Sequence, residues 1–326
     1  FSPQIAVDGL LLESLLWTWS DGTTATDYPE ATKDFGFAAA RTQYLAVAPR
    51  AALTALNLGF DAADGGETTP LDPRAPQNVS AVEFPAPLPG LRYFAASYNP
   101  LTNTLDFTDC TNLEAIECYN AATLRHAVLT NLPGLKRVCF EDADLQELDL
   151  SGNPALEDLR GALNAYTEIR ADRGTGPAVW HWCTRDNPQL TQSFQGLMTN
   201  FFAVRELFIW NDNQSGRFAP VSTNLQYLQA ADNHYTDLDL AGKATLIDCV
   251  VSGNSLTNLV LDGCPALQVL DAHANQLGTE QLDALLALFD TNAPAISSID
   301  LTRNAQIPSA TGYAHYSNLV ARGVSV

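Results

Sequence analysis

The chain has 326 residues, of which 46% are hydrophobic and 17% charged, so it can bury a continuous core and is not disordered by composition. Its 37 acidic and 17 basic residues give a net charge of -20, which disfavours nucleic acid and anionic membranes as partners. No apolar run reaches the roughly 18 residues that a membrane span requires, so no membrane insertion is expected. We interpret the acidity as a solubility feature rather than as an acidic docking face.

The N-terminal part of the chain combines an irregular segment with the start of a repeat. Residues 1–52 lack any regular frame and are predicted to form an N-terminal cap. A first repeat then shows apolar residues in two short runs, at Leu53, Leu56 and Leu58 and at Val79, Val82 and Phe84. Between the runs, residues 60–77 are rich in Gly, Pro and Thr, which predicts an inserted loop. Asp61, Asp64 and Glu67 do not follow the calcium-loop spacing of an EF-hand, so a solvated loop is favoured over a calcium site.

From residue 91 onward the sequence repeats one pattern: an anchoring Leu, apolar residues three and five positions later, and often Asn eight positions later. The anchors are Leu91, Leu113, Leu135, Leu156, Val179, Val204, Leu225, Leu246, Leu267 and Ile296. The alternation predicts a short strand with one buried face, and a single repeat cannot close a core, so neighbours must stack. A second apolar half in each repeat, as at Leu256, Leu259 and Leu261, predicts extended segments on both flanks. The Asn amide is expected to bond the backbone of adjacent turns.

This LxxLxLxxN pattern resembles the leucine-rich-repeat family, and in particular the 21–22-residue repeat arrays of bacterial surface or secreted proteins and of bacteriophage proteins. The resemblance covers roughly residues 53–326. It implies a mainly β, or α+β, solenoid whose concave face is a parallel sheet. We expect the repeat array over 53–277 and a C-terminal cap over 278–326. In that cap, Leu282, Leu285, Leu286 and Phe289 are spaced as on a helix, and a last strand follows.

Motifs that would indicate catalysis or a cofactor are not found in the sequence. None of the six cysteines forms a CxxC pair, so neither a zinc site nor a disulfide scaffold is expected. No P-loop, GxSxG or HExxH motif occurs. His181 and Cys183 share one strand face, but the sequence shows no third group that would orient the histidine for catalysis. We therefore favour ordinary polar residues on a strand over a nucleophilic pair. We therefore predict no enzymatic activity, no catalytic residue, no metal site and no cofactor.

Arginine and aromatic residues gather at outward positions of four consecutive repeats. Alternation along the strands places five of them on one face: Arg160, Arg185, Phe208, Trp210 and Tyr227. Such side chains are typical of binding hot spots, and they also suit sugar rings, which stack on aromatic faces. The pattern predicts a ligand-binding patch about 15–20 Å across, given strands ~4.8 Å apart. The alternative is that an inserted loop covers the aromatic side chains.

Together these features predict a recognition or adhesion module that binds a protein or a glycan at a cell surface. The expected location is extracellular, on a cell surface or on a virion. Two settings fit the resemblance, a bacterial surface or secreted protein and a bacteriophage receptor-binding protein. The alternative is a structural protomer that assembles with itself in a virion or an extracellular filament.

Overall fold

The computed structural model describes the backbone of residues 4–7, 14–18, 24–25, 44–48, 50, 53–58, 79–84, 87–171, 178–293 and 295–326. The chain forms two compact units. Unit 1 consists of Phe1–Leu156 and Arg170–Thr175, and unit 2 consists of Glu157–Ile169 and Gly176–Val326. The predicted loop over 60–77, with its acidic residues, lies outside the described residues. The predicted boundaries of cap and array at residues 52, 277 and 278 stay predictions.

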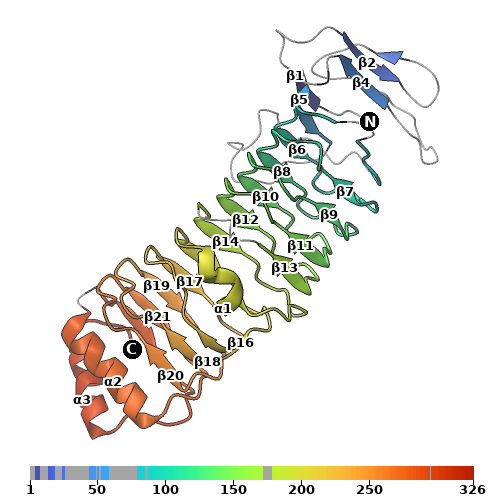
Figure 1. Ribbon diagram of the computed structural model, residues 1–326. Helices are drawn as coiled ribbons and strands as arrows, with labels where there is room; N and C mark the ends of the chain where they lie inside the picture. The colour runs from blue at the N-terminus through green and yellow to red at the C-terminus, as the bar shows by residue number, and fades with distance from the viewer. Residues whose placement is uncertain are drawn as a thin grey trace. The chain divides into compact units, whose positions relative to one another are not determined.

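Unit 1 contains short strands on two flanks of a coil (Figure 1). On one flank, β5 (Leu53–Asn57), β6 (Tyr93–Ala95), β8 (Ala115–Glu117) and β10 (Arg137–Cys139) pair in parallel, and β1 (Gln4–Val7) pairs antiparallel with β5. The other flank holds β7 (Leu105–Asp106), which pairs with β9 (Ala127–Val128), and β11 (Glu147–Asp149). Near the N-terminus, β2 (Ser14–Thr18) pairs antiparallel with β3 (Thr24–Ala25) and β4 (Tyr44–Ala48).

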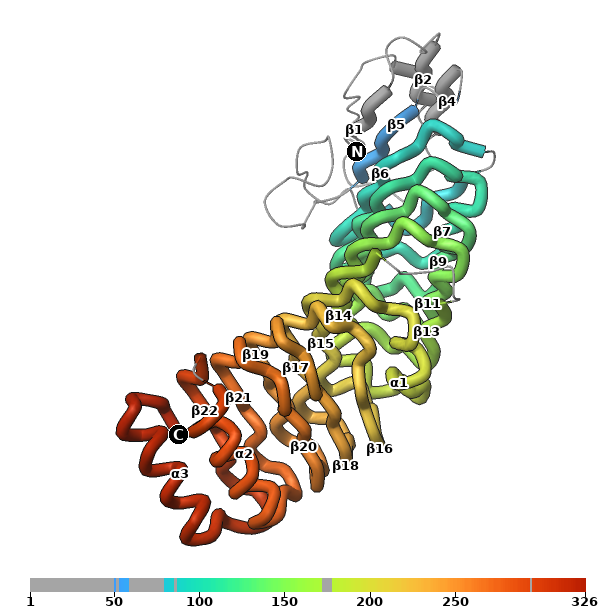
Figure 2. The backbone as a smooth tube through the Cα atoms, turned by 60° about the vertical axis from the view of Figure 1, so that its left-hand side comes forward, coloured from blue at the N-terminus to red at the C-terminus, as the bar shows by residue number. Residues whose placement is uncertain are grey.

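Unit 2 repeats the same arrangement and ends in helices (Figure 2). Its long parallel sheet runs through β12 (Asp158–Arg160), β14 (His181–Cys183), β15 (Glu206–Phe208), β17 (Tyr227–Gln229), β19 (Asp248–Val250), β21 (Val269–Asp271) and β22 (Ser298–Asp300). A second parallel sheet holds β16 (Ser215–Phe218), β18 (His234–Asp239) and β20 (Asn258–Val260), and a further short strand is β13 (Glu168–Arg170). The helices are α1 (Phe194–Leu197), the 3-10 turn η3 (Met198–Asn200), α2 (Thr279–Asn292) and α3 (Ala310–Ala321), of which α2 and α3 pack together.

The core is built from the predicted anchor residues. Every anchor from Leu91 to Ile296 is at most 5% exposed, and the second-half residues Leu256, Leu259 and Leu261 are at most 2% exposed. Both halves of each turn direct apolar side chains inward. Within each unit, the stacked turns therefore bury a core between the strands of the two flanks. The predicted leucine-rich-repeat solenoid with a parallel sheet is confirmed, as is the helix that carries Leu282 to Phe289.

Where an Asn follows a strand of the long sheet, its side chain joins neighbouring turns, as predicted. Asn254 shows the pattern: its Nδ2 donates to the carbonyl oxygens of Ala230 and Val251 at 2.9 and 3.1 Å. Its Oδ1 accepts from the Tyr235 backbone N–H at 3.0 Å. Equivalent amides are those of Asn99, Asn187, Asn233, Asn275 and Asn304. These bonds satisfy carbonyl and N–H groups that sheet pairing leaves unserved where the strands end.

One turn carries a carboxylate in place of this amide. Asp212 is fully buried, and its Oδ1 accepts from the Asn187 backbone N–H at 3.0 Å. Its Oδ2 accepts from Thr184 Oγ1 at 3.0 Å, and that hydroxyl in turn accepts from Trp182 Nε1 at 3.1 Å. In the other turns the Asn amide donates to backbone carbonyl oxygens. The Asp212 carboxylate cannot donate, and the Thr184 hydroxyl instead donates to it. Burial raises the pKa of Asp212 well above its ordinary value, although both hydrogen bonds lower it.

Replacing Asp212 by Asn is expected to flatten the dependence of stability on pH above the ordinary Asp pKa of about 4. Because burial raises the folded-state pKa of Asp212 above its unfolded value, the folded state holds this proton more tightly. The stabilisation that the protonated Asp212 carboxyl gives to the folded state is therefore fully present below the unfolded-state pKa. It is lost as the pH rises through the folded-state pKa. Urea denaturation of parent and variant at several pH values measures it, and superimposable pH profiles would contradict the assignment.

Candidate functional site

The register of the long sheet in unit 2 places the five predicted binding residues on four consecutive turns. Tyr227 of β17 stands in register with Glu206 of β15. Arg160 of β12 is in register with Cys183 of β14, which in turn faces Phe208 of β15. Arg185 and Trp210 each lie two residues after the end of a strand, β14 and β15 respectively. We call the five residues the Arg–aromatic patch: Arg160, Arg185, Phe208, Trp210 and Tyr227.

Arg185 and Trp210 form the centre of the patch. The guanidinium carbon of Arg185 lies 4.9 Å from the centroid of the Trp210 ring, a cation–π contact. Arg185 Nη1 also lies 3.1 Å from Asp186 Oδ2, and Asn211 Nδ2 donates to Asp186 Oδ1 at 3.0 Å. The Phe208 and Trp210 rings meet edge to face with centroids 6.2 Å apart. Because each group restrains the next, these side chains are held in place before any ligand arrives.

A buried acid–base pair lies beside the patch, and sequence reasoning did not find it. His181 Nδ1 is 2.6 Å from Asp158 Oδ1, and Arg160 Nε is 3.2 Å from Asp158 Oδ2. Burial alone would raise the pKa of Asp158, but the hydrogen bond and charge of His181, together with Arg160, lower it below its ordinary value. The His181 ring also meets Phe208 edge to face at 5.6 Å. Asp158 therefore helps to orient Arg160, and His181 packs against Phe208.

The exposure of the patch differs from the expectation in one respect. Phe208, Trp210 and Tyr227 are half-buried, whereas the sequence suggested exposed rings. The reason is that strands ~4.8 Å apart crowd large side chains against their neighbours. Trp180, just before β14, is 37% exposed and was not anticipated, because it precedes the alternating segment.

The structure shows what surrounds His181 and Cys183, for which the sequence favoured polar strand residues over a nucleophilic pair. Both residues lie on β14, and each is at most 9% exposed. The ring nitrogens of His181 face carboxylate oxygens, with Asp158 Oδ1 at 2.6 Å and Glu206 Oε2 at 4.0 Å. This arrangement favours the structural reading of His181 over a nucleophilic pair.

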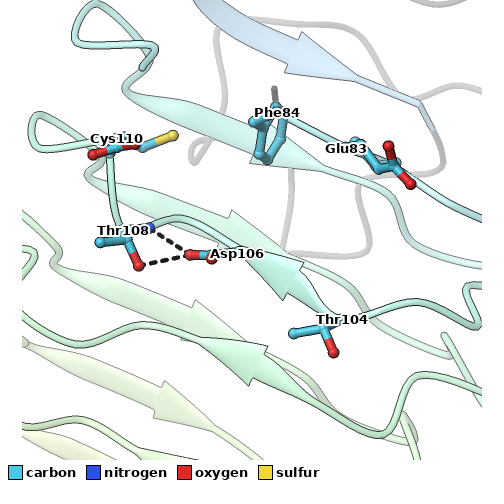
Figure 3. Close-up of a pocket in the computed structure, with 8 residues that line it drawn as sticks. Glu83, Phe84, Thr104, Asp106, Thr108 and Cys110 are labelled. Carbon is cyan, nitrogen blue, oxygen red and sulfur yellow. Dashed lines mark hydrogen bonds between the residues drawn. The ribbon is translucent and has the colours of Figure 1, made fainter. Parts of the chain in front are cut away.

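Unit 1 has a shallow hollow of its own beside β7 (Figure 3). It is lined by Val82, Glu83, Phe84, Thr104, Asp106, Thr108, Asp109 and Cys110. Asp106 Oδ1 accepts from the backbone N–H and the hydroxyl of Thr108, at 2.9 and 2.6 Å. Burial raises the pKa of the Cys110 thiol to about 11, so this thiol is protonated at neutral pH. The hollow therefore offers neither an ionised nucleophile nor an unengaged carboxylate at Asp106.

Solved structures resemble this chain, whereas no protein-family model and no curated protein matches it. An internalin, InlF, from Listeria monocytogenes matches with a TM-score of 0.57 and 15% identity, over 71% of this chain and 66% of that one. The functional domain of InlJ from the same species matches with a TM-score of 0.56 and 22% identity, over 69% and 47%. The chain thus spans less than two thirds of either structure's length. At these identities the likeness shows the fold alone: the chain has a leucine-rich-repeat fold.

Among the helices formed by the described residues, none is long and apolar enough to cross a membrane.

Proposed function

We propose that this chain is a non-enzymatic recognition module that binds a protein ligand through the Arg–aromatic patch of unit 2. The observation that supports it most is the restrained cluster of Arg185, Trp210 and Phe208 at the ends of β14 and β15. Side chains that are already ordered lose little conformational entropy on binding, and Trp and Arg are the residue types that dominate hot spots. The internalin-like fold supports a binding role by analogy only.

A protein ligand is favoured over a glycan by the position of Arg185. Its guanidinium lies over the Trp210 ring, so one indole face is already covered. A sugar ring needs an open aromatic face on which to stack, whereas a protein epitope can pack against the edges and the arginine. We place this module outside the cytoplasm, at a cell surface or on a virion, in a bacterial or a bacteriophage setting.

The second candidate is a structural protomer that assembles with itself. It is favoured by apolar side chains at the C-terminal end of unit 2: Ile307, Tyr313 and Val320 are 69%, 48% and 47% exposed. Light scattering over a range of protein concentrations separates the two functions. The mean molar mass of a recognition module stays constant, whereas that of a self-assembling protomer rises with concentration.

Trp210→Ala is expected to weaken ligand binding by about 2 kcal/mol, roughly 30-fold, with a nearly unchanged melting temperature. The ligand is first captured from solubilised cell envelopes on the immobilised chain, and its dissociation constant is then measured for parent and variant. Tyr313→Ala, which removes a 48% exposed aromatic residue away from the patch, is the matched control and should bind normally. If Trp210→Ala instead unfolds the protein while the folded fraction binds normally, Trp210 is a core residue and the proposal fails.

A further inference from the structure

Three potential metal ligands converge at the C-terminal end of the long sheet, away from the Arg–aromatic patch. Asp271 ends β21, His273 follows two residues later, and Asp300 ends the neighbouring strand β22. His273 Nδ1 lies 2.6 Å from Asp271 Oδ1 and 4.0 Å from Asp300 Oδ2. One ligand atom from each residue lies within 4.8 Å of the other two. We propose that Asp271, His273 and Asp300 bind a divalent transition-metal ion of the Zn²⁺ type.

Hydroxyl groups from the surroundings aim both carboxylates at the imidazole. Ser252, after the adjacent strand β19, donates its hydroxyl to Asp271 Oδ2 at 3.1 Å, which leaves Oδ1 directed toward His273. Thr302 donates its backbone N–H and its hydroxyl to Asp300 Oδ1 at 2.9 and 2.7 Å, so Oδ2 is the oxygen nearer His273. Outer groups that fix the orientation of ligating carboxylates in this way are a regular feature of metal sites.

The charge around the three ligands also favours a cation. Asp248 of β19 lies near Asp271, and the pKa of Asp248 is raised by burial and by the negative charge of Asp271. Its Oδ1 is buried and has no hydrogen-bond partner among the described residues. The carboxylates of Asp271 and Asp300 thus flank the His273 imidazole, and Asp248 adds a third carboxyl near Asp271. The positive charges that act on Asp300 are those of His273 and Arg303. A bound divalent ion would compensate the excess of negative charge.

The ligand set indicates which ion is bound. One imidazole nitrogen and two carboxylate oxygens suit Zn²⁺, which takes such ligands at about 2.0–2.2 Å and would therefore space them about 3.3 Å apart. The separations of 2.6 and 4.0 Å straddle that value, so small side-chain rotations would close the site. Calcium requires six to eight oxygen ligands and does not fit an imidazole. Three protein ligands leave one coordination position for water or for a donor from a bound partner.

Calorimetric titration of the full chain with zinc chloride near pH 7, after treatment with a chelator, tests the proposal. We expect one equivalent of Zn²⁺ to bind. His273→Ala and Asp300→Asn should each weaken binding by at least tenfold. In Asp300→Asn the amide oxygen can still accept from Thr302, so the substitution replaces only the oxygen that faces His273. Melting curves without zinc should be the same for parent and both variants.

His315→Ala is the matched control, because His315 Nδ1 also pairs with a carboxylate, Asp290 Oδ2 at 2.8 Å. This variant should bind Zn²⁺ like the parent. The proposal is overturned if the parent binds no zinc at concentrations up to about 1 mM. A dissociation constant of that size corresponds to a binding free energy of only ~4 kcal/mol. It is also overturned if His273→Ala and Asp300→Asn both bind like the parent, or if His315→Ala removes the binding. If Asp300→Asn misfolds, Ser252→Ala replaces it, with an expected loss of about tenfold.

Discussion

Truncation of Leu246 or Leu267 to alanine is expected to lower the free energy of unfolding by about 2–5 kcal/mol. Both side chains are fully buried anchors between the two sheets of unit 2. Removing three carbon atoms forfeits their transfer from water and leaves a cavity. The stacked turns on either side are tied by backbone hydrogen bonds, such as Gln268 N–H to Ile247 O at 2.8 Å, and cannot collapse to fill it. Urea denaturation monitored by circular dichroism measures the change.

Leu163→Ala provides the matched control for these two substitutions. Leu163 is 45% exposed, so its truncation should change the free energy of unfolding by less than about 0.5 kcal/mol. If Leu246→Ala and Leu267→Ala are as mild as the control, the register that places these residues in the core is wrong.

The repeat could be predicted from the sequence because the residues of each turn fix the register of that turn. A leucine at every anchor and an asparagine eight residues later leave a single frame in which all apolar side chains face inward. The same frame located the Arg–aromatic patch, since alternation alone decides which side chains point outward. Arg160 and Tyr227 are therefore on one face, as predicted, although their ligand is a proposal.

Helices outside the repeat frame could not be predicted in the same way. α1 and η3 together cover only 194–200, too few residues for a helical period. Their buried Phe194, and Phe201 just after them, pack edge to face on Trp182 with centroids 6.3 and 4.9 Å away. α3 has a side-chain cap at Ser309, but Leu319 is the only large apolar residue that it buries, so its apolar pattern is weak.

Contacts between turns explain what sequence reasoning missed in the functional sites. The Asp158–His181 pair joins residues 23 positions apart. Asp300 lies near His273 because β21 and β22 pair in the sheet, although α2 separates these strands in the sequence. No short sequence motif indicates that the residues of either pair lie close together in the fold. A polar residue on a strand therefore appears as surface decoration until the register of its neighbours is known.

Asn254→Asp is expected to cost about 3–5 kcal/mol at neutral pH, because it buries a charge without a compensating donor. Asn254 Nδ2 faces the carbonyl oxygens of Ala230, Val251 and Ser252, at 2.9, 3.1 and 3.3 Å. A carboxylate oxygen in that place would meet acceptors only. Asp212 shows what the substitution lacks, since there the Thr184 hydroxyl donates to the carboxylate. Ala230 holds the position in its turn that Thr184 holds in the turn before Asp212, and it has no hydroxyl.

Two measurements test this account of the buried amide. The penalty of Asn254→Asp should shrink on acidification, because burial raises the folded-state pKa of the new carboxyl and a protonated carboxyl can donate to one carbonyl oxygen. Adding Ala230→Thr should recover about 1–3 kcal/mol relative to the sum of the single substitutions, by supplying the missing donor. Urea denaturation of parent, both single variants and the double variant, at about pH 4 and 7, gives this coupling energy. A pH-independent penalty with no coupling to Ala230→Thr would show that the loss arises from packing rather than from an unpaired charge.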